Sequence, residues 1–141
     1  MTIESERYLM FEAVRDVSGD FTTSSGATIA PFDRMVVNTN PGVFDLTTGV
    51  FTAPFSGTYS FYLEGETRDD ASDTFISWNM NGVQQEQIQI DEGQQHNYPF
   101  TNSITLTMNT GDKLLAFMSA GGGVSCQQGL YHLHFGGKLV Y

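Results

Sequence analysis

The sequence contains one cysteine, Cys126, among its 141 residues, so no disulfide can form within a single chain. The fold must therefore depend on its apolar core or on assembly with other copies of itself. A single thiol leaves the redox compartment open.

Positive charge is also scarce. Six Lys and Arg stand against sixteen Asp and Glu, which gives a formal net charge of -10. The six cations are scattered from Arg7 to Lys138, whereas a surface that follows a phosphate backbone needs them clustered. The charge balance argues against nucleic acid and anionic lipid as partners.

Long apolar runs and collagen-like glycine triplets are missing as well. No run approaches the roughly 18–20 apolar residues of a membrane span, so we expect a soluble protein without membrane insertion. Glu4 and Glu6 stand where a secretory leader would be positively charged. If the protein is exported, we expect its leader to lie outside this sequence.

What is present is a chain that can build a core. Hydrophobic residues make up 40% of it and charged residues only 16%, a balance typical of folded domains and unlike disordered ones. A length of 141 residues suits one core and not two. We therefore expect a single domain over residues 1–141.

The apolar pattern indicates β-structure. Aromatic residues are spread along the whole sequence, Gly or Asn interrupts it about every ten residues, and no window has the apolar stripe of an amphipathic helix. Short strands at this spacing are typical of an antiparallel sandwich or barrel. We expect very little helix.

Two strands show the alternation most clearly. Along Thr58–Leu63, Tyr59 and Phe61 point to one face and Tyr62 to the other. Along residues 131–141, Phe135 and Tyr141 fall on one side, opposite His132 and His134.

Turn residues predict how other strands are joined. Asn81-Gly82 is a strong signal for a type I′ hairpin between Phe75–Met80 and the strand that begins at Val83. Asn109–Asp112 predicts a second hairpin, between Ser103–Met108 and Lys113–Met118. Three stretches rich in Gly, Asp, Gln and Ser are expected as exposed loops that carry any variable binding surface: 64–73, 91–98 and 119–128.

Catalytic motifs are absent from the sequence. Nucleophilic catalysis needs a Ser, Thr or Cys beside an oriented base, and no Gly-x-Ser-x-Gly elbow occurs. The three histidines do not form a His-Glu-x-x-His zinc motif. We expect a protein that is not an enzyme.

His132 and His134 are two possible metal ligands with strand spacing. Residues two apart on a strand share a face, so the two imidazoles could hold a common ion or, at a subunit interface, make assembly sensitive to pH. The plainer interpretation is that both are polar residues on a sheet face.

Ordered motifs along nearly the whole chain, from about residue 8 to 141, resemble those of the C1q domain family, the globular heads of complement C1q and its relatives. The central motif comprises Phe32–Asn38, Phe44, Thr48–Pro54 and Gly57–Phe61. The flanking motifs are Met10–Arg15, Asn81-Gly82, Gly111–Leu114 and Phe135–Tyr141.

The resemblance implies a ten-stranded antiparallel jelly-roll sandwich, shared with the tumour necrosis factor family, that assembles as a homotrimer. Aromatics on both faces of Thr58–Leu63 exceed what a monomer core needs, which agrees with assembly. The rings expected in the core or at the trimer interface are those of Tyr59, Phe61, Tyr62, Phe135 and Tyr141.

A calcium ion is the one cofactor that the resemblance suggests. Some C1q-like trimers hold Ca²⁺ near the apex through an acidic pair, and Asp91 or Glu92 falls near the first of those positions. Tyr98 or Pro99 occupies the second, where a carboxylate is lost. The alternative is a solvated acidic loop.

By this resemblance we expect a secreted recognition protein of innate immunity that binds glycans or other ligands of microbial surfaces. Three weak sites on one trimer would gain avidity on a repetitive surface. The alternative is a signalling or adhesive ligand similar to tumour necrosis factor, which binds a protein receptor between subunits.

Overall fold

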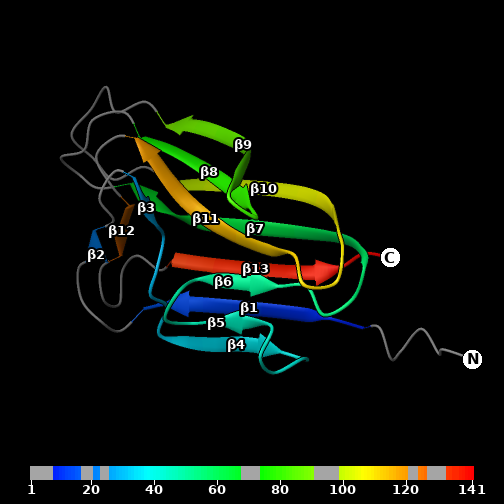
Figure 1. Ribbon diagram of the computed structural model, residues 1–141. Coiled ribbons are helices and arrows are strands. Elements are labelled where there is room, and N and C mark those ends of the chain that lie inside the picture. The colour runs from blue at the N-terminus through cyan, green and yellow to red at the C-terminus, as the bar shows by residue number, and fades with distance from the viewer. Residues whose placement is uncertain are drawn as a thin grey trace, which may run out of the picture.

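The computed structural model describes residues 8–16, 21–22, 26–67, 74–90, 99–120, 124–126 and 133–141. These residues form thirteen β-strand segments and no helix, in two stacked sheets (Figure 1). Within them, no helix long and apolar enough to cross a membrane occurs.

Sheet A contains seven strands, with β10 paired to β7 beside the path β2-β12-β7-β13-β1-β4. In chain order they are β1 (Met10–Arg15), β2 (Phe21–Thr22), β4 (Arg34–Asn38), β7 (Gly57–Thr67), β10 (Pro99–Met108), β12 (Val124–Cys126) and β13 (Leu133–Leu139).

Sheet B contains six strands, with β3 paired to β11 beside the path β5-β6-β11-β8-β9. They are β3 (Ala27–Thr28), β5 (Phe44–Asp45), β6 (Val50–Thr52), β8 (Thr74–Met80), β9 (Val83–Ile90) and β11 (Lys113–Ala120).

The expected all-β fold of two antiparallel sheets is confirmed, because the pairings in both sheets are antiparallel. The described segments outnumber the ten strands expected, since five of them are only two or three residues long. The other eight have five residues or more.

The hairpin predicted at Asn81-Gly82 is confirmed. Asn81 has φ 53° and Gly82 φ 84°, the pair of positive values that a type I′ turn requires, and β8 pairs with β9 on either side of it.

The second predicted hairpin is wrong. Strand β10 pairs with β7 in sheet A, whereas β11 pairs with β8, β6 and β3 in sheet B. The turn at Asn109–Asp112 therefore carries the chain from one sheet to the other. A turn sequence specifies a reversal of direction but not the sheet of the following strand.

The loop expected over residues 64–73 begins later than predicted. Strand β7 continues to Thr67 because β10 pairs with it as far as Glu66 and β12 pairs with Glu66 and Thr67. Partner strands on both sides satisfy the backbone here, so tertiary pairing overrides the polar composition.

The core between the sheets is aromatic. Phe11 stacks on Phe51 with ring centroids 5.2 Å apart, and Trp78 meets Phe135 edge-on at 5.3 Å. Truncating one such ring to Ala costs about 3–5 kcal/mol in a typical core. The rings of this buried network belong to Phe11, Phe32, Phe44, Phe51, Tyr59, Phe61, Trp78 and Phe135.

Candidate functional site

The face of sheet A that points away from the core is the candidate site. Along β7, Tyr59, Phe61 and Leu63 are buried in the core, so Thr58, Ser60, Tyr62 and Glu64 face outward by alternation. Beside β7 this outer face carries mostly short polar side chains: Thr101, Ser103, Thr105 and Thr107 of β10, with Gly136 of β13.

Tyr62 reaches across this face. Tyr62, Gly136 and Glu12 are direct partners on three neighbouring strands, β7, β13 and β1. A Cβ at position 136 would overlap the Tyr62 ring, so only glycine lets the ring lie flat over β13. The Tyr62 hydroxyl thereby reaches β1, where it donates a hydrogen bond to Glu12 Oε1.

Gly137 performs the matching role on the core face. A Cβ there would come within 2.6 Å of Phe61 Cδ1 and 2.8 Å of Phe11 Cε1. The two rings close over β13, with centroids 6.4 Å apart. The Gly136-Gly137 pair thus lets aromatic side chains cross one strand on both of its faces.

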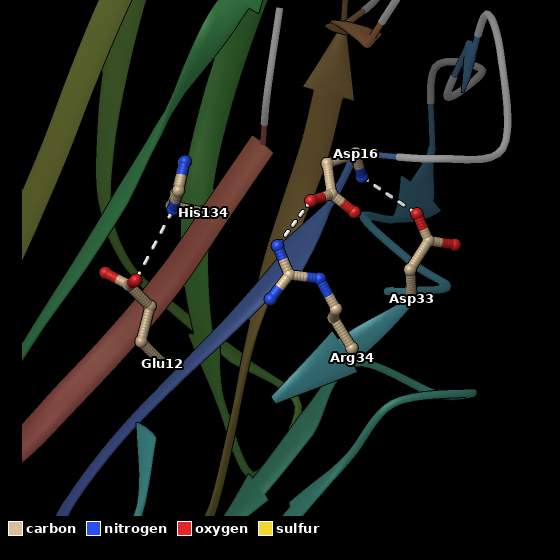
Figure 2. A network of polar contacts seen from close by, with 5 residues as sticks. All are labelled: Glu12, Asp16, Asp33, Arg34 and His134. Atoms are coloured by element: carbon tan, nitrogen blue, oxygen red, sulfur yellow. Dashed lines mark hydrogen bonds and ion pairs between the residues drawn. The ribbon is translucent and has the colours of Figure 1, made fainter. Parts of the chain in front are cut away.

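Glu12 also holds His134. Its Oε2 lies 3.5 Å from His134 Nδ1, and both side chains are half-buried (Figure 2). In register, Glu64 of β7 faces His134 from the opposite side. His134 therefore lies near two carboxylates of its own chain.

The environment of Tyr62 keeps its phenol protonated. Partial burial raises the pKa of Tyr62 most, and the hydrogen bond to Glu12, the charge of Glu12 and that of Glu64 raise it further. At neutral pH the hydroxyl is therefore a donor to the carboxylate.

A hollow of about 410 Å³ lies beside this cluster on the same face of sheet A. Its lining combines apolar surface with two opposite charges, Glu12 and Lys138. The residues that line it are Met10, Phe11, Glu12, Val37, Ser60, Tyr62, Gly137 and Lys138. It can accept an apolar group flanked by polar ones.

A second polar network fixes the β1–β4 side of sheet A. Arg34 Nη2 donates to Asp16 Oδ2 at 2.5 Å, and the Asp16 backbone N–H donates to Asp33 Oδ2 at 2.8 Å (Figure 2). The hydrogen bond and charge of Asp16 raise the pKa of Arg34, which stays cationic. These contacts join the end of β1 to the start of β4.

The five rings predicted for the core or the trimer interface separate into two groups. Tyr59, Phe61 and Phe135 are at most 1% exposed in the single chain, so their burial needs no partner. Tyr62 lies half-buried on the outer face, and Tyr141, beyond the end of β13, is 79% exposed. Tyr59, Phe61 and Phe135 therefore belong to the core of the single chain, which is one of the two places predicted for these rings.

Three predicted site residues, Asp91, Glu92 and His132, lie outside the described residues. His134 is described, but the structure therefore does not place it relative to His132. In the part of the chain that the structure describes, no group of three or more His, Cys, Asp or Glu side chains forms a metal site.

The sequence pattern placed Lys138 on the same strand face as His132 and His134, but it did not single out Glu12 or Gly136. The signal that could have found Gly136 is two successive glycines inside a strand pattern, which indicates close approach of another group. No comparable signal identifies Glu12, since its role depends on the register between β1, β13 and β7.

The C1q domain family model matches residues 11–140. No curated protein sequence matches the chain. Among solved structures, the globular domain of zebrafish complement 1qA is similar at 17% identity and a TM-score of 0.72, covering 94% of this chain and 98% of that one.

Two further structures share the fold. Eiger TNF from S. frugiperda has 14% identity and a TM-score of 0.75, with 96% of this chain and 94% of that one covered. Murine APRIL at pH 5.0 has 7% identity and a TM-score of 0.71, with 94% and 99% covered. At these identities the likenesses show the fold alone.

Proposed function

Because the chain belongs to the C1q domain family, we propose that it is a homotrimeric, secreted recognition protein that binds glycans of microbial surfaces. Domains of the C1q and tumour necrosis factor type form trimers, bind receptors or ligands, are typically extracellular and are typically not enzymes. For this chain, we propose three properties: it forms a trimer, it is secreted and it binds glycans.

The outer face of sheet A is the proposed trimer interface, and the hollow beside Tyr62 is the observation that carries the proposal. A hollow of about 410 Å³ with apolar lining and the opposite charges of Glu12 and Lys138 suits side chains of a neighbouring subunit. The short Ser and Thr side chains of β7 and β10 let another chain approach the sheet closely.

Two properties support a glycan as the ligand. The net charge of -10 disfavours anionic polymers but does not oppose the binding of neutral ones. Trimerisation multiplies weak sites, which suits a repetitive polysaccharide surface. Calcium, held through Asp91 or Glu92, is the proposed ion if binding depends on metal.

Glycan-array binding of the purified protein, with and without chelator, tests this function. We expect binding to one or more microbial glycans, and loss of binding with chelator if calcium takes part. Absence of glycan binding together with a tight, stoichiometric protein partner would instead support the alternative, a receptor ligand of the tumour necrosis factor type.

A further inference from the structure

A second hollow, of about 370 Å³, lies away from the proposed trimer interface. It is formed where the β5–β6 hairpin meets the first residue of β11, in sheet B. Its lining residues are Gly42, Asp45, Thr48, Val50, Thr52 and Lys113. It belongs to the other sheet, so the outer face of sheet A does not include it.

The polar groups of this hollow are positioned by the chain itself. Asp45 Oδ1 accepts the backbone N–H groups of Thr47 at 2.9 Å and Thr48 at 3.3 Å, a local turn that fixes the carboxylate. On the other side, Lys113 Nζ donates to Thr52 Oγ1 at 3.2 Å. Both side chains are thus oriented without a ligand.

Together these groups suit a ligand with many hydroxyls. A carboxylate accepts hydrogen bonds from hydroxyls, an ammonium donates to their oxygens, and the two threonine hydroxyls do either. Val50 adds an apolar surface for a C–H face. Hydrogen bonds to charged groups are the stronger kind, so Asp45 and Lys113 would make the strongest hydrogen bonds to such a ligand.

A zwitterionic ligand fits the hollow less well. Such a ligand makes the same kind of contact with Asp45 and Lys113, but it lacks the hydroxyls that Thr48 and Thr52 can bind. An anionic ligand would also meet the Asp45 carboxylate and the net charge of the chain. A cationic ligand would meet the Lys113 ammonium. A ligand of either charge is therefore repelled by one group of the hollow, which favours a neutral one.

We propose that the hollow lined by Asp45, Thr48, Thr52 and Lys113 binds one neutral hexose unit of a glycan. The inference rests on the proposed function and names its site. A volume of about 370 Å³ is near the low end of ligand pockets, which run from about 300 to 1,000 Å³. Since no aromatic ring lines it, a single site binds weakly and three sites per trimer supply the avidity.

The test is a titration of the isotope-labelled full chain with the methyl glycosides of glucose, mannose, galactose and N-acetylglucosamine, followed by backbone amide shifts. We expect saturable shifts at Thr48, Thr52 and Lys113 with at least one of the four sugars. Glycine betaine, a zwitterion without hydroxyls, should leave these amides unchanged.

Three variants locate the site. Asp45→Asn keeps an oxygen for the turn but removes the charge, and Lys113→Met removes the ammonium. Each should weaken sugar binding about tenfold, the loss of one hydrogen bond to a charged group. Glu86→Gln, on exposed β9, makes the same charge change as Asp45→Asn outside the hollow and should bind like the unmodified chain.

The result that overturns the inference is distinct from failure of the proposed function. If the unmodified protein binds array glycans while Asp45→Asn and Lys113→Met bind equally well, the hollow is not the site and glycan recognition stands. Amide shifts confined to other residues, or shifts only with betaine, also overturn it. If the array shows no glycan binding, the proposed function fails, and the monosaccharide titration still decides whether the hollow binds sugar.

Discussion

The Tyr62 ring lies flat over Gly136 and places its hydroxyl on Glu12, two strands away in sheet A. The side chain crosses the intervening strand only because position 136 has no Cβ. This arrangement forms one wall of the hollow on the proposed interface.

Replacing the two glycines of β13 should have unequal effects on stability. Gly136→Ala pushes against Tyr62, which can swing outward, whereas Gly137→Ala pushes against the buried Phe61 and Phe11. Overpacking typically costs about 1–3 kcal/mol of the free energy of unfolding. We expect Gly136→Ala to lie near the low end of this range and Gly137→Ala near the high end, as measured by urea unfolding.

A double-mutant cycle isolates the Tyr62 contact. In a Tyr62→Ser background, Gly136→Ala should cost close to nothing, because the ring it displaces is gone. An unchanged cost in that background would show that the glycine is required by the backbone and not by Tyr62.

Tyr62→Phe should change how stability depends on alkaline pH. Burial and Glu12 raise the pKa of Tyr62, so the folded chain holds its proton while an unfolded chain releases it near pH 10. The contribution of Tyr62 is therefore complete below about pH 10 and declines as pH rises further. Between pH 8 and pH 11, the free energy of unfolding of the unmodified protein, measured with urea, should fall toward that of Tyr62→Phe. A constant difference across that range would contradict the account.

Calcium should raise the melting temperature if Asp91 or Glu92 binds it. A ligand that binds the folded state alone stabilises it, and Ca²⁺ prefers carboxylate oxygens. The shift should disappear with chelator and in the variant Asp91→Asn/Glu92→Gln. Glu86→Gln serves as the control for loss of charge. If calcium raises the melting temperature equally in the unmodified protein, the double variant and Glu86→Gln, the ion binds elsewhere.

The sequence predicted those parts of the fold that depend on local pattern. Alternation at Tyr59, Phe61 and Tyr62 identified the two faces of β7, and Asn81-Gly82 identified the β8–β9 turn. The pairing of β10 and β11 with different sheets could not be read in the same way, because strand partners are chosen by packing across the whole domain.

The candidate site was less predictable than the fold. Tyr62 and His134 were identified as polar or aromatic residues on an outer face, but their link through Glu12 needs the register of β1 against β13. The hollow proposed to bind sugar is lined by Asp45 and Lys113, residues far apart in the chain. Sequence spacing carries no information on such contacts.

Sedimentation equilibrium at micromolar concentration tests the central claim most directly, for the unmodified protein and for Lys138→Glu. The account predicts a trimer of about 47 kDa, three copies of a 15.6-kDa chain. It also predicts dissociation in Lys138→Glu, which places a second negative charge beside Glu12 in the hollow, while the circular dichroism spectrum of the chain stays that of a folded β-protein. A strict monomer, or a trimer that Lys138→Glu leaves intact, would contradict assembly through the outer face of sheet A.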